Sequence, residues 1–168
     1  MKKKHSTFNI EHSTPIDSEA YNYVLHDGGN GQQKFDLEER LLVFASTVID
    51  LSEKLPDSRA GNHVAGQILR SGTAPYPNHG EAEAAESRDD FVHKLKICLK
   101  ELRETRRWAR LIERKDWAKR DPALTRVLTE SDELIRIFFS SIQTARRNIQ
   151  NQRRKSAGST RYTSGEAG

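Results

Sequence analysis

The stretch that most constrains the fold runs from Ser87 to Arg114, because it reads as one long helix whose faces differ in chemistry. Apolar and small residues recur along it at alternating intervals of four and three, the spacing of a helix buried against other helices. They are Phe91, Leu95, Cys98, Leu102, Thr105, Ala109 and Ile112. A seam of this length is buried only if the rest of the chain supplies further helices.

Two further lines of residues follow the same rhythm on this helix. The first, which we call the basic stripe, has no acidic member and consists of Lys96, Lys100, Arg103, Arg107, Arg110 and Arg114. The second, which we call the mixed flank, consists of Ile97, Glu101, Glu104, Trp108 and Leu111. The helix therefore presents a core face, a positive face and a mixed face.

Helices are also predicted before and after this one. The first begins at Asp36, whose carboxylate can cap backbone N–H groups, and ends at Pro56, because proline pushes the preceding residue out of the helical region. Its buried line is Leu37, Leu41, Phe44, Val48, Leu51 and Leu55. The last begins at Asp121-Pro122, a cap followed by proline at the first helical position, and reaches Gln150. Its line is Leu124, Leu128, Ser131, Ile135, Phe138, Ile142, Ala145 and Ile149.

A further helical segment is predicted from about Ser58 to Glu86. It contains glycines such as Gly61 and Gly72, which weaken a helix but allow another backbone to come close. Pro75 and Pro77 interrupt its hydrogen-bond ladder, and we expect a kink there rather than an end.

Four amphipathic helices with short connections and no strand pattern predict an all-α fold, an antiparallel up-down four-helix bundle with crossing angles of about 20°. We expect residues 35–151 to form this bundle. Residues 1–34 are predicted to be a flexible extension, with a short extended piece at residues 21–25. Residues 152–168 are predicted to be a basic and then Ser/Gly-rich disordered tail, since their composition cannot build a core.

The distribution of charge says more about function than the modest net charge of +4. Residues 94–115 carry nine basic and three acidic side chains, and residues 146–161 carry six basic and no acidic ones. Such an asymmetry indicates a polyanionic partner, most commonly nucleic acid. In the tail, Arg153, Arg154 and Lys155 could add phosphate contacts on a flexible arm.

The sequence also limits where the protein works. It has no apolar run long enough to span a membrane, and no apolar segment follows the basic start, so a secretory signal is not expected. Its single cysteine, Cys98, falls on the buried seam, which leaves no disulfide framework or cysteine-rich metal site. We expect a cytoplasmic protein without membrane contact.

The middle of the chain, from Gly66 to Ile112, resembles the bacterial four-helix bundle proteins known as 23S rRNA intervening-sequence proteins. Two motifs before the long helix carry the likeness: Gln67, Arg70 and Ser71, then Asn78, Glu81 and Ala82. The start of the long helix matches at Ser87, Asp90 and Phe91, and its body matches at Lys96, Ile97, Lys100, Glu101, Glu104, Thr105 and Trp108. The chain departs from the family pattern at Ala74, Pro75, His79 and Gly80. In that segment the resemblance implies a shared fold but not a shared function.

This resemblance implies a homo-oligomer arranged as a ring, such as a pentamer, and no enzyme activity. It also implies kinship with the basic accessory proteins of diversity-generating retroelements, which act with a reverse transcriptase and bind nucleic acid.

Two interpretations of the basic stripe remain open from the sequence. It could bind RNA or DNA without reading bases, or it could be an ordinary solvated face, although solvated faces commonly mix charges to gain pairs along the helix. If the stripe does bind a polyanion, an acidic partner protein would make the chain an interaction scaffold or accessory subunit instead. For the mixed flank, a subunit interface and a contact within the chain both remain open.

Catalytic, metal and cofactor sites are not predicted. His79, His93, Glu81, Glu83 and Glu86 invite a metal hypothesis, but bundle di-metal sites need Glu-x-x-His on two helices, and the sequence has none. A solvated acidic helix end explains these residues better. We expect Ser71 and Asn78 to bond backbone near the prolines rather than to bind a ligand.

Overall fold

The computed structural model describes the backbone of residues 37–162 and the side chains of residues 37–154. Its helices are α2 (Leu37–Ser52), α3 (Arg59–Thr73), α4 (Pro75–Glu83), α5 (Arg88–Arg114) and α6 (Pro122–Tyr162). Between residues 37 and 162 there is no strand. The predicted extension at residues 1–34, its piece at residues 21–25 and the cap at Asp36 lie outside the described residues.

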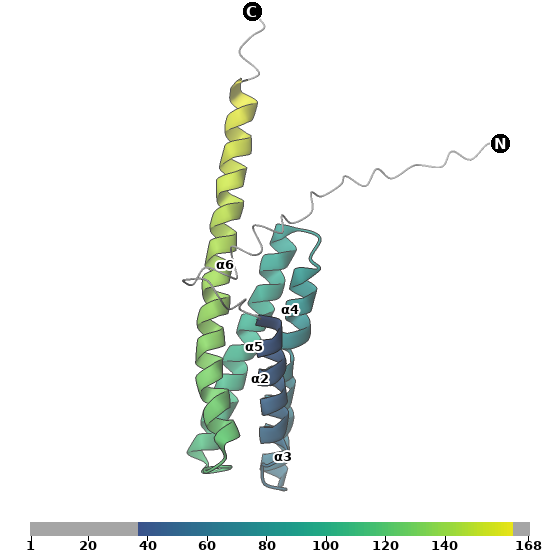
Figure 1. The fold of residues 1–168 in the computed structure, drawn as a ribbon, viewed down its shortest axis with the longest axis vertical. Coiled ribbons are helices and arrows are strands. Elements are labelled where there is room, and N and C mark those ends of the chain that lie inside the picture. Colours follow the sequence, from purple (N-terminus) through teal and green to yellow (C-terminus); the bar gives the residue numbers. More distant parts are fainter. Residues whose placement is uncertain (1–36, 163–168) are drawn as a thin grey trace, which may run out of the picture.

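α4 continues α3 in the same direction, and with these two taken as one the helices run alternately in opposite directions and form a bundle (Figure 1). α2 packs against α3 and α6, while α5 packs against α3, α4 and α6. α2 and α5 are therefore diagonal to each other, and α3 with α4 runs along the length of α5 (Figure 1). The predicted all-α, antiparallel up-down bundle is confirmed.

The seam of α5 lies at the centre of this bundle. All seven of its predicted residues are buried, and Leu95, Leu102 and Ile112 have no exposed surface. In α2 the predicted line is buried from Leu37 to Leu51, and only Leu55, beyond the helix, is partly exposed. Periodicity alone therefore identified the core faces of these two helices.

Close helix contacts explain two of the glycines. A Cβ on Gly72 would lie 2.5 Å from Val48 Cγ1 of α2, and one on Gly61 would lie 1.9 Å from the Pro56 carbonyl oxygen. No heavier side chain fits at either position without a shift of the backbone. Between α3 and α5, the Thr105 hydroxyl donates to Ser71 Oγ at 3.0 Å.

The prolines kink the second helix rather than end it, as predicted. Ala74, between α3 and α4, keeps helical angles of φ −60° and ψ −34°. The Asn78 backbone N–H donates to the Ala74 carbonyl oxygen at 3.3 Å, and the Asn78 side-chain amide donates to the same oxygen at 2.8 Å. Ser71 Oγ likewise donates to the Gln67 carbonyl oxygen at 3.0 Å.

Side-chain caps fix the helix starts. Ser58 Oγ accepts from the Gly61 N–H at 3.0 Å, and Ser87 Oγ accepts from the Asp90 N–H at 3.1 Å. At α6, Asp121 Oδ1 accepts from the Ala123 N–H at 2.8 Å. These bonds satisfy N–H groups that have no partner within the helix.

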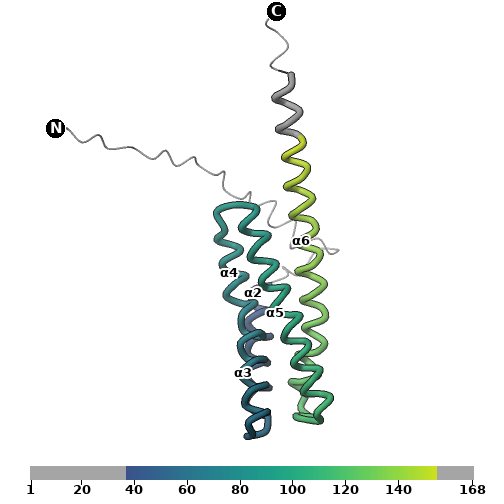
Figure 2. Tube along the Cα trace, turned by 180° about the vertical axis from the view of Figure 1, so that it is seen from behind, coloured from purple at the N-terminus to yellow at the C-terminus, as the bar shows by residue number. Residues whose placement is uncertain are grey.

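The end of α6 differs from the prediction. The helix continues past Gln150 to Tyr162, and Figure 2 shows it passing the turn between α4 and α5. Glutamine, arginine, lysine and alanine, which dominate residues 150–157, favour helix without needing a core. Residues 163–168 of the predicted tail lie outside the described part.

Candidate nucleic-acid interface

The basic stripe lies on the outer surface of α5. All six of its side chains are exposed. Lys100 Nζ lies 3.0 Å from Glu101 Oε1. The other five, Lys96, Arg103, Arg107, Arg110 and Arg114, form no hydrogen bond or ion pair with any described residue.

Some cations elsewhere on the bundle pair across helices. Arg40 of α2 binds Glu130 and Glu133 of α6, and the hydrogen bond that it donates to Glu130 raises the pKa of its guanidinium. Arg106 Nε lies 2.5 Å from Asp132 Oδ1 of α6.

Other cations, such as Arg59 of α3 and Arg126 of α6, are also exposed without an ion pair among the described residues. The basic stripe is distinct because five such cations follow one another along a single helix face.

α6 adds cations beside the stripe that were not predicted. Asp132 is bound to Arg106 of α5, so the side of α6 that carries Asp132 faces α5. Arg136, Phe139 and Arg146 follow Asp132 by four, seven and fourteen residues, intervals that return to the same side of a helix. All three are exposed. We call the basic stripe together with these three residues the α5–α6 face.

The spacing of these three residues from Asp132 is visible in the sequence. It identifies them as part of this face only when the Arg106–Asp132 pair shows which side of α6 lies against α5.

A depression marks the C-terminal end of the stripe. It has a volume of about 650 Å³ and is lined by Arg107, Arg110, Leu111, Glu113, Arg114 and Asp116. Asp116 also lies 3.0 Å from Lys119 Nζ. Three stripe arginines thus converge on one hollow.

The tail cations lie at the other end of the bundle. Arg153 pairs with Asp89 at the start of α5, at 2.9 Å, whereas the depression lies at the end of α5. The intervening helix is roughly 37 Å long at 1.5 Å per residue. Arg154 is exposed, and the side chain of Lys155 lies outside the described part. These cations form a second cluster rather than a continuation of the depression.

The mixed flank faces α3 of the same chain. Arg70 of α3 binds Glu104 and lies 3.3 Å from Glu101. Trp108 is half-buried, and its ring meets His63 of α3 edge-on at 6.1 Å between centroids. Glu101 is only 5% exposed. Ile97 is half-buried as well. Leu111, at 39% exposure, is therefore the most exposed member of the flank.

Three of the residues weighed for metal binding contact neighbouring side chains. Glu81 pairs with Lys94 at 2.5 Å, and the buried His79 meets Phe138 edge-on at 6.2 Å and lies 3.8 Å from Glu83. Burial raises the pKa of the Cys98 thiol to about 12, which keeps it unreactive near neutral pH. In the described range no three histidine, cysteine or acidic side chains are placed to hold a metal ion.

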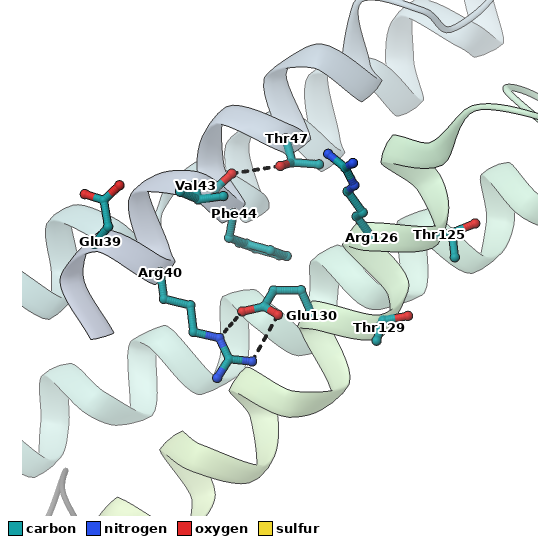
Figure 3. Close-up of a pocket in the computed structure, with 9 residues that line it drawn as sticks. All are labelled: Glu39, Arg40, Val43, Phe44, Thr47, Thr125, Arg126, Thr129 and Glu130. Carbon is teal, nitrogen blue, oxygen red and sulfur yellow. Dashed lines mark hydrogen bonds and ion pairs between the residues drawn. The ribbon is translucent and has the colours of Figure 1, made fainter. Parts of the chain in front are cut away.

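A second hollow, of about 580 Å³, lies between α2 and α6. Figure 3 shows Val43 and Phe44 on its α2 side and the Arg40–Glu130 pair at its edge. This hollow was not predicted, because it depends on how the two helices diverge.

Together the fold and the face define a class of protein, a small antiparallel helix bundle with one long cationic side. The sequence model of the family described as 23S rRNA-intervening sequence protein matches residues 33–140. Since this match covers more than half of the chain, the chain belongs to that family.

A solved structure supports this placement. It is the crystal structure of a protein of unknown function from the S23 ribosomal protein family of Bacteroides thetaiotaomicron, 35% identical to this chain with a TM-score of 0.58. The alignment covers 63% of this chain and 97% of that one. No relative with a curated description matches. Among the described residues, no helix has the length and apolar character needed to cross a bilayer.

Proposed function

We propose that this chain is a non-enzymatic, oligomeric four-helix bundle of the cytoplasm that binds RNA or DNA through the basic stripe without reading base sequence. One observation carries the proposal: five of the six stripe cations are exposed and unpaired among the described residues. The charge of a cation without a carboxylate partner is not offset within the protein, so it is available to phosphate oxygens. Contacts of this kind are the main source of sequence-independent affinity.

The dimensions of the stripe suit a nucleic acid. From Lys96 to Arg114 the helix rises about 27 Å. Double-stranded DNA carries one negative charge for about every 1.7 Å of its axis, so a bound strand presents phosphates to every stripe residue. Contacts to phosphate position a nucleic acid without specifying its sequence.

Charge reversal tests the proposal. The triple variant Arg103→Glu, Arg107→Glu and Arg110→Glu should abolish binding to a mixed-sequence RNA in a gel shift at low salt. Arg59 and Arg126 serve as the control, because both are exposed and form no ion pair among the described residues. Their reversal to glutamate should leave most of the binding. Unchanged binding by the triple variant would refute the proposal.

An acidic partner protein is the second candidate, favoured by the depression in which Arg107, Arg110 and Arg114 surround Leu111. A carboxylate-rich protein surface with an apolar centre would suit that hollow. The kinship with reverse-transcriptase accessory proteins that the sequence resemblance implies would fit such a subunit role. Tagged protein should recover nuclease-sensitive material if nucleic acid is the partner. A stoichiometric protein that survives nuclease treatment would favour the second candidate.

Self-association is part of the proposal. Family membership supports it, and so do exposed apolar side chains on adjacent helices, with Leu69 of α3 at 38% and Leu111 of α5 at 39% exposure. Light scattering should give an oligomer for the native chain and smaller species for Leu111→Glu or Trp108→Glu. The Leu111 variant matters more, since Trp108 also packs within the chain. A monomeric native chain would contradict this part.

A further inference from the structure

The most exposed aromatic ring among residues 37–154 lies in the α5–α6 face. Phe139 is 48% exposed, whereas its neighbour Phe138 is completely buried. Phe138 thus supplies the aromatic side chain that the core needs at this level of α6. Phe139 contributes little to the core, and an exposed phenyl ring in water is unfavourable unless a partner covers it.

The position of Phe139 follows from the pair between α5 and α6. Asp132 binds Arg106, and Phe139 lies seven residues after Asp132 on the same side of α6. Because the helices are antiparallel (Figure 1), seven residues forward on α6 correspond to seven residues back on α5 from Arg106. The ring is therefore level with residue 99, between Lys96 and Arg103 of the basic stripe.

By register, both helices carry cations on either side of the level of the ring. Lys96 and Arg103 lie on α5, and Arg136 and Arg146 lie three residues before and seven after Phe139 on α6. All four are exposed and form no ion pair with described residues. The nearby carboxylates of Asp132 and Glu133 are already bound, to Arg106 and Arg40. This part of the surface therefore combines an exposed phenyl ring with cations that have no carboxylate partner among the described residues.

We infer that the α5–α6 face binds single-stranded nucleic acid, with Phe139 stacking on an unpaired base while the flanking lysine and arginine side chains hold the phosphates. This inference rests on the proposed function and specifies its ligand. Stacking platforms of this kind accept any base, because every base has a π-face. In a duplex the base faces are covered by neighbouring pairs, so the ring gains nothing from a double strand.

Substitution of Phe139 separates stacking from charge. Fluorescence anisotropy would use labelled oligouridylate RNA, oligothymidylate DNA and an RNA duplex of the same length. Phe139→Leu keeps an apolar side chain but loses the flat ring, and it should weaken binding of both single strands by roughly tenfold. Phe139→Trp should bind them as well as the native chain. Duplex binding should be the same for all three proteins.

The outcomes distinguish this inference from the proposed function. If Phe139→Leu binds single strands as the native chain does, while the stripe reversal abolishes binding, the stacking inference is wrong and the proposed function stands. A native chain that prefers the duplex would also overturn the inference. A native chain that binds none of the three probes would overturn both. Equal losses on RNA and DNA are expected, since a stacked ring contacts the base and not the sugar.

Discussion

Two glycines of α3 show that identical residues on one helix can have opposite roles. Gly72 faces Val48, where an added Cβ would lie 2.5 Å from a methyl carbon, whereas a Cβ on Gly66 would meet no atom within 4 Å. Gly66 is exposed and Gly72 is buried. Gly72 therefore permits a close helix contact, while Gly66 carries only the entropic cost of glycine in a helix.

Alanine substitution should separate the two roles. Gly72→Ala should lower the free energy of unfolding by about 1–3 kcal/mol through overpacking. Gly66→Ala should raise it by about 0.5–1 kcal/mol, because alanine restricts the unfolded chain and favours helix. Urea unfolding of both variants measures this. A similar shift in both would contradict the close contact between α2 and α3.

At the residue scale, the sequence predicted which side chains are buried better than it predicted which side chains meet across helices. The seam of α5 follows directly from its spacing, and all of it is buried. The stripe was also found, because uniform charge at helical spacing is visible without a structure. Phe139 and Arg136 were missed, since nothing local shows that this side of α6 faces α5. The α3 partner of Glu101 and Glu104, Arg70, was missed for the same reason.

Among the helices, the start of α6 is linked to the end of α2. Asp121 caps α6 through the Ala123 N–H and pairs with Lys54, just beyond α2, at 2.8 Å. The hydrogen bond from Lys54, together with that from the Ala123 N–H, lowers the pKa of the Asp121 carboxyl. The charged carboxylate therefore stabilises both the helix start and the contact between two chain segments.

The contribution of Asp121 to the free energy of unfolding should depend on pH. A carboxyl whose pKa is lower in the folded state stabilises the fold above its unfolded pKa, and that stabilisation is lost as the pH falls through the folded pKa. The native chain should therefore exceed Asp121→Asn in free energy of unfolding near neutral pH, and the difference should shrink below about pH 4. Urea unfolding across this range measures it. A difference that stays constant down to pH 2 would contradict the role of the charge.

Helix starts were easier to predict than helix ends. The predicted cap at Asp121 bonds the Ala123 N–H, and Ser58 and Ser87 cap the helices that start beside them, since a cap is a local signal. The end of α6 has no glycine or proline to stop it before residue 158. Its extension to Tyr162 depends on helix propensity. A prediction that ends the helix at the last core-forming residue therefore misses it.

For the whole molecule, the bundle and the outer part of α6 should be separable. Among the side chains of α6 up to residue 154, the last buried one is Ala145, with Ile149 packed against the core. Truncation after Asn151 should therefore leave the midpoint of urea unfolding unchanged within error. The same truncation removes Arg153, Arg154 and Lys155 and should weaken nucleic-acid binding only modestly. A large loss of stability would show that residues beyond 151 complete the core.

The architecture as a whole was predictable because each helix carries its own periodic face and cap. The candidate site was predictable only in part, because a third of the α5–α6 face comes from a neighbouring helix whose orientation is set by packing. Pairing across helices also decides which cations remain available, and that pairing is a property of the folded chain.

The salt dependence of nucleic-acid binding tests the central claim most directly. Affinity for an oligouridylate should fall steeply with salt, since each neutralised phosphate of a single strand adds about 0.7 to the slope of log affinity against log salt. In Arg103→Gln with Arg107→Gln, the slope should drop by roughly 1.4. In Arg59→Gln with Arg126→Gln, it should match that of the native chain. Equal slopes in the stripe variant and the native chain would contradict the claim that the basic stripe binds phosphates.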